Sequence, residues 1–511
     1  MKSYKIYALT MMAAVALGAT ACSDDEPVLT DRNLPGTSNF YDFADEQKAD
    51  IFYKPYVGYV GDPMPFFDPV ENNFKVMYLQ DFRPNQAYTY HPIWCVETSD
   101  AASYTSLGEL ICCGTDKELD AAIGTGSTIY HEGIYYTFYT AHSPSQSSTA
   151  GINEAVMLAT STDFRTWTKN RSVIISAGAE YSNVDFRDPF VFRGDDNRFH
   201  MLISTRKDGK GVLAEYVSDD LLAWTSAGVF MTMMWDRFYE CPDLFKMGDW
   251  WYLVYSEQHN AIRRVQYFKG RTLDELKACT ANDAGIWPDS HEGFLNGRGF
   301  YAGKTASNGT DRFIWGWCAT KAGNATDGAI DWAGALVAHK LCQNEDGTLY
   351  TTEVPAIAQH IGNAASIADV TLAGDESHLF PRLKTVNRIA FTVTAASASD
   401  RFGISLGRGS DSETYYTLMV NPESDTVRKI NLEQEGEGGK GFIGDNDSYV
   451  FPTPVDNVYN VVIVTDNSVV SLYINNVLTY TNRIYNTAKN CWSINSYGGQ
   501  ISVSNISVSS K

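Results

Sequence analysis

An internal repeat between about residues 50 and 345 constrains the fold of this chain more than any other feature. Each copy begins with a small or charged residue, runs through a short apolar strand, turns at Gly, Asp or Asn, and returns through an aromatic-rich strand. The steps between successive openings are 64, 62, 52 and 59 residues, for openings at Asp62, Gly126, Asp188, Glu240 and Gly299. Short strands that recur at such a spacing are typical of β-propeller blades. The repeat therefore predicts an all-β fold with a five-bladed β-propeller over residues 49–350.

A second, weaker repeat runs in phase with the first and favours four strands in each blade. An Asp stands four positions before an aromatic residue in three successive copies, at Asp100 and Tyr104, Asp163 and Trp167, and Asp220 and Trp224. Helical periodicity is weak throughout the chain, and we expect no more than one or two turns at Leu273 to Lys277.

The sequence changes character after about residue 365, where short apolar strands replace the longer repeat. Val470, Leu472 and Ile474 alternate with a period of two, and the Asn475-Asn476 pair that follows is typical of a hairpin turn. We expect residues 365–511 to form a second all-β domain, a β-sandwich.

The N-terminus has the pattern of an export signal. Lys2 and Lys5 precede an apolar and small-residue run from Leu9 to Ala21, and Cys22 follows directly. The run is too short to span a bilayer well. It resembles a bacterial lipoprotein signal, in which Cys22 is lipidated, and an ordinary cleaved secretory peptide is the alternative.

The lipoprotein interpretation divides the N-terminal segment into a signal peptide at 1–21 and an acidic tether at 22–48. Ser23 to Glu26 is similar to the acidic signal that sends lipoproteins of some Gram-negative glycan-scavenging bacteria to the outer face of the cell. We therefore expect a protein held to the outer membrane, facing outward, with the lipid on Cys22 as its only membrane attachment.

Composition and charge exclude several classes of protein. Apolar residues make up 44% of the chain, aromatic residues 13% and charged residues 20%, unlike the composition of disordered chains. The 40 Lys and Arg against 61 Asp and Glu give a net charge of -21, so nucleic acid is not an expected partner. The cysteines are scattered without the spacing of a zinc site, and we expect neither a metal nor another cofactor.

The geometry of a propeller indicates where chemistry is expected. The first strand of each blade lines the central channel, so five strand starts converge on one funnel. Three of the openings are acidic: Asp62, Asp188 and Glu240. Three carboxylates in one concave site provide acid, base or nucleophile chemistry on a neutral polar substrate. Taken singly, Asp62 before Pro63 also suits a turn, and Arg187-Asp188 also suits a structural ion pair.

These motifs resemble glycoside hydrolase family 32, the fructan-cleaving enzymes built from a five-bladed propeller and a C-terminal sandwich. The family's Trp-Met-Asn-Asp-Pro-Asn-Gly motif corresponds to Tyr59 to Pro65, its Arg-Asp-Pro motif to Arg187 to Pro189, and its Glu-Cys motif to Glu240-Cys241. Thr125-Gly126-Ser127 partly matches the family's Phe-Ser-Gly-Ser. The segment from Phe313 to Leu336 looks like the family's fifth blade.

The resemblance implies a retaining hydrolase of β-fructosidic bonds in levan-, inulin- or sucrose-type oligo- and polysaccharides. Asp62 is then the nucleophile, Glu240 the acid/base and Asp188 the residue that stabilises the transition state. A raised pKa of Glu240 and an ionised Asp62 follow from these roles. The candidate substrate-binding residues are Arg187, Asp81, Arg83, Ser127 and Trp315. Further candidates for stacking on a sugar face are Trp94, Trp235 and Trp317.

The first motif departs from the family pattern at Gly61 and at Met64-Pro65. The family's Asn residues at these places contribute to the pocket for the terminal fructose, so the departure indicates a divergent branch or an unusual substrate. Two alternatives stay open. One is an inverting arabinan or xylan hydrolase of the five-bladed family 43 type, whose carboxyl groups lie about 6.5–9.5 Å apart against roughly 5–5.5 Å for retention. The other is a non-catalytic glycan-binding lipoprotein that has kept the propeller.

Overall fold

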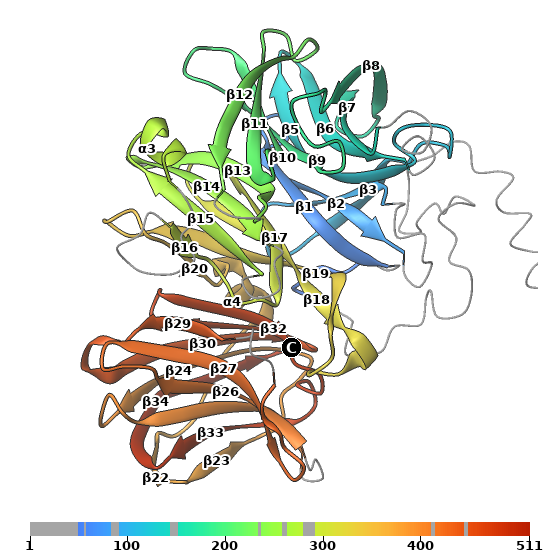
Figure 1. The fold of residues 1–511 in the computed structure, drawn as a ribbon. Coiled ribbons are helices and arrows are strands. Elements are labelled where there is room, and N and C mark those ends of the chain that lie inside the picture. The colour runs from blue at the N-terminus through green and yellow to red at the C-terminus, as the bar shows by residue number, and fades with distance from the viewer. Residues whose placement is uncertain are drawn as a thin grey trace, which may run out of the picture.

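The structure is a computed structural model of the chain. It describes residues 50–55, 58–82, 91–143, 152–233, 237–257, 263–279, 292–409, 414–443 and 448–511. The expected signal peptide, Cys22 and the acidic tether lie outside the described residues. Two strand-rich modules follow one another along the described chain, the N-terminal one in blue to yellow and the C-terminal one in orange to red (Figure 1).

Within the described residues, the N-terminal module consists of five four-stranded antiparallel units in chain order. The first unit contains β1 (Tyr59–Asp68), β2 (Asn73–Asp81), β3 (Ile93–Thr98) and β4 (Thr105–Ile111). The second contains β5 (Ala122–His131), β6 (Ile134–His142), β7 (Glu154–Ser161) and β8 (Thr168–Ser176). The third contains β9 (Phe186–Arg193), β10 (Phe199–Lys207), β11 (Lys210–Ser218) and β12 (Thr225–Thr232). The fourth contains β13 (Glu240–Met247), β14 (Trp250–Glu257), β15 (Arg264–Gly270) and β16 (Glu292–Phe294). The fifth contains β17 (Phe300–Ser307), β18 (Arg312–Lys321), β19 (Ile330–Gln343) and β20 (Leu349–Thr352).

The first strands of these units form a closed ring. β1 contacts β5, β5 contacts β9, β9 contacts β13, β13 contacts β17, and β17 contacts β1. The last unit is also joined to the first through a backbone pair between Val60 of β1 and Gly334 of β19. This radial order is that of a β-propeller, with the first strands innermost.

The C-terminal module is a sandwich of two antiparallel sheets. One sheet contains β21 (Ala365–Ser366), β22 (Val370–Gly374), β24 (Val386–Ala395), β30 (Val458–Asp466), β31 (Val469–Ile474), β32 (Leu478–Arg483) and β34 (Gly499–Ser510). The other contains β23 (Ser377–Phe380), β25 (Arg401–Arg408), β26 (Thr414–Pro422), β27 (Val427–Gly436), β28 (Gly441–Phe442), β29 (Tyr449–Pro452) and β33 (Cys491–Tyr497). The predicted all-β architecture, a propeller followed by a sandwich, is confirmed.

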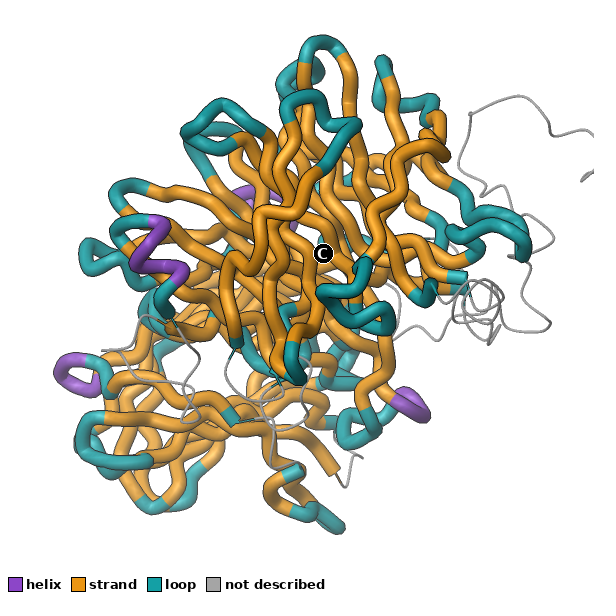
Figure 2. The backbone as a smooth tube through the Cα atoms, turned by 45° about the horizontal axis from the view of Figure 1, so that its top comes forward, coloured by secondary structure: helices purple, strands orange, loops and turns teal. Residues whose placement is uncertain are grey.

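Helices are few and short in the described residues, as the tube drawing shows (Figure 2). They are α3 (Leu273–Lys277), α4 (Pro355–Ile361) and the 3-10 segments η2 (Ala322–Asn324) and η3 (Val455–Asn457). The expected turns at Leu273 to Lys277 are confirmed as α3, whose first turn is capped by the side chain of Thr272. Among the described residues, none of the helices has the length and apolar character to cross a membrane.

The two modules share part of their apolar core. On β31, Val470, Leu472 and Ile474 pack inside the sandwich, as their period of two predicts. Val469 and Tyr473 point to the opposite face and pack in a cluster with residues of the propeller. β31 is therefore covered on both of its faces, and all six of its residues are buried.

Candidate active site

A cavity of about 740 Å³ is lined by the innermost strands of the propeller. Asp62, Asp188 and Glu240 all line it, so the structure brings the three predicted carboxylates together. The remaining walls include residues 326–332, which run from the loop after η2 into the start of β19, and Ile443 of the C-terminal module. The volume lies within the roughly 300–1,000 Å³ of sites for small ligands.

Each innermost strand carries a β-bulge near the cavity. The bulged residues are Asp62-Pro63, Thr125, Asp188-Pro189, Cys241-Pro242 and Ala302-Gly303. Because bulged residues leave the ladder, three of the bulges accommodate a proline. Bulges also re-aim side chains, and the first bulged residue lines the cavity in four of the five units: Asp62, Thr125, Asp188 and Cys241.

The bulges correct the register of the predicted repeat. Asp62, Thr125, Asp188, Cys241 and Ala302 are equivalent by pairing, whereas Gly126 lies one residue further along its strand and Gly299 precedes β17. Glu240 therefore stands one residue before its bulge, at the place that Arg187 holds in the third unit and Tyr301 in the fifth.

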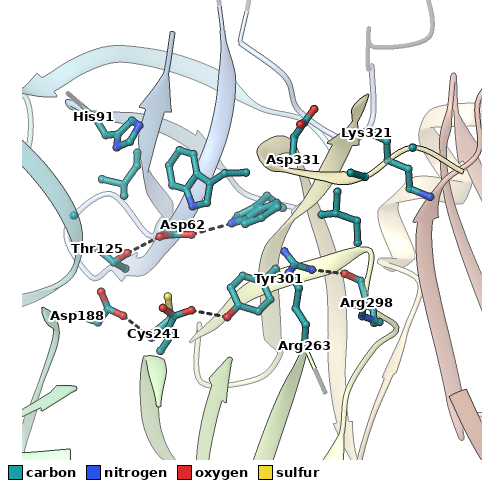
Figure 3. A pocket seen from close by; sticks show the side chains of 18 of the residues that line it. Asp62, His91, Thr125, Asp188, Cys241, Arg263, Arg298, Tyr301, Lys321 and Asp331 are labelled. Atoms are coloured by element: carbon teal, nitrogen blue, oxygen red, sulfur yellow. Dashed lines mark hydrogen bonds between the residues drawn. The ribbon is translucent and has the colours of Figure 1, made fainter. Parts of the chain in front are cut away.

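Asp62 is held by two side chains (Figure 3). The indole Nε1–H of Trp317 donates to its Oδ1 at 2.9 Å, and the hydroxyl of Thr125 donates to its Oδ2 at 2.9 Å. Burial and the charge of Asp188 raise the pKa of Asp62 above its usual range, and the two hydrogen bonds oppose that rise. The two donors fix the orientation of both oxygens and favour the carboxylate, whereas the net shift of the Asp62 pKa stays upward.

Glu240 has a different environment. Its Oε2 accepts a hydrogen bond from the phenol of Tyr301, and its Oε1 lies 3.3 Å from a guanidinium nitrogen of Arg187. Burial is the main cause that raises the pKa of Glu240 to about 7, Arg187 opposes it, and Asp188 adds to it. The site thus holds a carboxyl group that keeps its proton near neutral pH.

Arg187 and Asp188 link neighbouring units of the propeller. Besides Glu240, the Arg187 guanidinium pairs with Glu154 at 3.3 Å and Asp185 at 2.8 Å. Asp188 has a left-handed backbone with φ of 58°, and its Oδ2 accepts the backbone N–H of Cys241 at 2.9 Å. Asp188, on β9, is therefore tied to β13, the strand that carries Glu240.

Several predicted site residues lie elsewhere. Ser127 is buried, and its hydroxyl accepts the backbone N–H of Val191 at 2.9 Å, which joins the second and third units. Trp315 is buried in the core, where its indole donates to the hydroxyl of Tyr104 at 3.2 Å. Neither residue lines the cavity, so their assignment to substrate binding is wrong.

The other candidates divide into three groups. Asp81 is buried at the end of β2, one strand outward from the ring, and does not line the cavity. Trp94 is likewise a core residue, whereas Trp317 does line the cavity. Arg83 and Trp235 lie outside the described residues.

Sequence reasoning missed Tyr301, Arg263, Arg298 and Trp332, which also line the cavity. The guanidinium of Arg263 lies 4.0 Å from the ring centroid of Tyr301 and donates to the backbone carbonyl of Arg298 (Figure 3). Burial lowers the pKa of Arg263 to about 10, which leaves it charged at neutral pH. Tyr301 is identified by the strand pairing in the structure, which places it one residue before a bulge, as Glu240 is. Arg263 and Arg298 lie outside the repeated openings.

Among the residues that the structure describes, no group of three or more His, Cys, Asp or Glu side chains is placed to hold a metal ion. The described cavity offers a part-buried carboxyl group with two donors, a second carboxyl group whose pKa is raised to about 7, and the guanidinium groups of Arg187 and Arg263. These are the parts of a two-carboxylate glycosidase.

Comparisons with known proteins identify the family of the chain. The model of the glycosyl hydrolases family 32 N-terminal domain matches residues 52–352, and the model of the GH32, BT1760-like, C-terminal domain matches residues 345–508. Sucrose-6-phosphate hydrolase of Escherichia coli is 24% identical over 348 residues, which cover 63% of this chain and 68% of that enzyme. The match to sucrose-6-phosphate hydrolase of Vibrio alginolyticus, at 26% identity, covers 35% of this chain and 38% of that enzyme.

The fold is also that of solved structures. Fructan 1-exohydrolase IIa from Cichorium intybus superposes with a TM-score of 0.74 and 14% identity, covering 92% of this chain and 98% of that one. At this identity the likeness concerns the fold, whereas the family model spans more than half of the sequence. The resemblance seen in the motifs is thereby confirmed, and the chain belongs to family 32 of the glycosyl hydrolases.

Proposed function

We propose that the protein is a retaining hydrolase of β-fructofuranosidic bonds in fructans or fructo-oligosaccharides. The observation that carries the proposal is the pairing, in one cavity, of Asp62, held by two hydrogen-bond donors, with Glu240, whose pKa is raised to about 7. A nucleophile that is ionised and an acid that is protonated at the same pH are the two groups that a retaining glycosidase requires. The names of the relatives, sucrose-6-phosphate hydrolase and fructan 1-exohydrolase, support a fructosyl substrate.

In the first step, a carboxylate oxygen of Asp62 attacks the anomeric carbon of the fructosyl unit. The bond to the leaving oxygen breaks as Glu240 donates its proton to that oxygen, which leaves a fructosyl ester on Asp62. In the second step, the Glu240 carboxylate takes a proton from water, the water oxygen bonds to the anomeric carbon, and Asp62 departs as a carboxylate.

Asp188 and Arg187 have supporting roles in this scheme. The Oδ1 atom of Asp188 stays available for the ring hydroxyls of a fructosyl unit, since the bond to Cys241 uses Oδ2. The positive charge of Arg187 stabilises the Glu240 carboxylate that forms in the first step, because its guanidinium lies 3.3 Å from that group.

The roles of Asp62 and Glu240 can be separated by the leaving group. Glu240→Ala should lose on the order of 10²–10⁴ in rate on a natural sugar leaving group. On an activated aryl fructoside the loss should be much smaller, and azide should restore turnover by attacking the fructosyl ester. Asp62→Ala should be nearly inactive on both substrates and should not respond to azide. Equal losses for Glu240→Ala on both leaving groups, without rescue, would remove it from the acid/base role.

The substrate is identified by a panel of levan, inulin and sucrose-type oligosaccharides, with the products resolved by chromatography. Arabinan and xylan are the matched negative substrates, because they represent the inverting alternative. Release of arabinose or xylose without fructose would contradict the proposal.

The proposed location is the outer membrane, through a lipid on Cys22, on the basis of the small-residue run that ends at that cysteine. Cys22→Ala should release the protein from the membrane fraction of the producing cells. Membrane association that is unchanged by the substitution would exclude the lipid anchor.

A further inference from the structure

Trp332 presents the most exposed aromatic ring in the lining of the cavity, among its described residues. Its side chain is 37% exposed, whereas Trp317, which contacts Asp62, is 1% exposed. Trp332 therefore lies nearer to the solvent than the ring that positions Asp62. An indole that stays exposed at the rim of a polar cavity loses apolar burial, and this loss is offset when a ligand covers it.

The backbone directs Trp332 into the cavity. β19 pairs regularly with β18 up to Gly334, opposite Ala319, and pairing resumes only at Ile330, opposite Lys321. Three residues, Asp331 to Ala333, thus stand against the single residue Thr320, and Ala333 has a left-handed φ of 64°. A bulge of this kind re-aims the side chains that it contains, here toward the carboxylates.

The ring of Trp332 occupies the space beside Gly61. A Cβ atom added at Gly61 would lie 2.2 Å from Cη2 of Trp332, which is far inside contact distance. The φ angle of Gly61 is not in the left-handed region, so its backbone does not require glycine. The indole of Trp332 therefore fills the space that a side chain at position 61 would need. Gly61 directly precedes Asp62, so the indole lies beside the proposed nucleophile.

His91 completes this aromatic pair. The ring centroids of His91 and Trp332 lie 4.5 Å apart with an interplanar angle of 32°, and His91 also lines the cavity. The centroids of Trp317 and Trp332 lie 6.2 Å apart. The aromatic surface thus runs outward from the side of Asp62 to the rim.

We propose that Trp332 and His91 form a stacking platform for the sugar on the leaving-group side of the scissile bond, and that Gly61 provides the room for it. The inference rests on the proposed function, because it assumes that the fructosyl unit is attacked by Asp62. A fructosyl unit bound against Asp62 lies next to Trp317, and the sugar attached to it then extends toward the exposed ring of Trp332. The apolar face of a pyranose or furanose packs on such a ring.

The first experiment compares two substrates that differ only in the leaving group. A β-fructo-oligosaccharide has a sugar on the leaving-group side, whereas β-fructofuranosyl fluoride has none. Trp332→Ala should raise KM for the oligosaccharide by about 5–10-fold, the range of a lost aromatic contact, with a smaller change in kcat. For β-fructofuranosyl fluoride, the same substitution should change KM by no more than about twofold. Trp332→Phe keeps a ring and should recover most of the loss.

The outcomes separate the inference from the function on which it rests. Equal losses on both substrates, or a loss of kcat alone, would overturn the stacking platform while leaving the hydrolase assignment intact. No turnover of either substrate by the unaltered protein would overturn the proposed function and this inference with it.

A double-mutant cycle tests the role of Gly61. The methyl group of Gly61→Ala must displace the indole, so this variant alone should raise KM for the oligosaccharide. In the Trp332→Ala background the same change should have much less effect, because the ring is no longer present. If the change in KM of the double variant equals the product of the changes in the two single variants, Gly61 does not act through Trp332.

Discussion

Tyr301 and Glu240 stand at equivalent places in neighbouring units of the propeller, each one residue before a bulge, and the phenol of Tyr301 donates a hydrogen bond to the carboxyl group of Glu240. The repeat thus provides not only the acid but also the side chain that tunes it. Removing the donor to Glu240 should therefore move the alkaline limb of the pH profile of kcat/KM, and removing a donor to Asp62 should move the acidic limb.

Tyr301→Phe should shift the alkaline limb of kcat/KM to higher pH. A general acid works while protonated, so activity falls as the pH rises through the pKa of Glu240, about 7 in the unaltered enzyme. The Tyr301 hydrogen bond stabilises the carboxylate and lowers this pKa, so its removal raises the pKa. An alkaline limb that moves to lower pH would contradict the assignment.

Trp317→Phe should shift the acidic limb of the same profile to higher pH. Asp62 must be ionised to attack, and the indole N–H at 2.9 Å is one of the two side-chain bonds that favour the ionised form. Thr125→Val removes the other bond and is the matched variant, with the same expected direction. If both variants change kcat but leave the acidic limb in place, Asp62 is not the group that this limb reports.

The three carboxylates are predictable from the sequence because they recur at the same place in the repeat. Asp62, Asp188 and Glu240 each open an apolar strand, and the closure of the ring brings strand openings together. The bulges are not predictable from the pattern of apolar residues. The repeat therefore aligns Gly126 and Gly299 with Asp62, whereas the structure shows that Thr125 and Ala302 are the equivalent residues. Tyr301 was missed for that reason.

The error at Trp315 has a different cause. Trp315 and Trp317 are two residues apart on β18 and share a face of the sheet, so the alternation cannot separate them. Their positions along the strand differ by about 6.6 Å, which leaves Trp317 at the cavity and Trp315 between two units, against Phe74. Trp332 is outside the repeated openings, and only the three-dimensional structure places it beside Gly61.

Glu240→Gln should stabilise the protein at alkaline pH. The folded-state pKa of Glu240, about 7, lies above the ordinary value of 4.5, so stability from proton binding is complete below pH 4.5 and is lost as the pH rises through 7. The glutamine variant does not titrate, and its advantage should grow across this window to on the order of 2–3 kcal/mol. Chemical denaturation at pH 5 and pH 8 measures the difference. Glu423→Gln, at an exposed glutamate, is the control. An advantage that shrinks with rising pH would contradict the raised pKa.

Arg483→Met should weaken both the fold and catalysis, because Arg483 connects the sandwich to the strand that carries Trp317. The buried guanidinium donates to the carbonyl of Ala319 at 2.8 Å and to that of Cys318 at 3.3 Å, and both residues follow Trp317 on β18. It also donates to Ser468 of its own module at 2.9 Å.

Removal of the guanidinium leaves buried carbonyls without these donors, and we expect a loss of about 2–5 kcal/mol in the free energy of unfolding. Because the end of β18 is then less firmly held, the bond from Trp317 to Asp62 should be populated less, and kcat should fall at temperatures where the variant is still folded. Arg408→Met is the matched control, since Arg408 bonds Ser377 and Ser493 within the sandwich. It should lower stability without changing kcat. A folded Arg483→Met variant with the kcat of the unaltered enzyme would show that the sandwich supports the propeller without positioning Trp317.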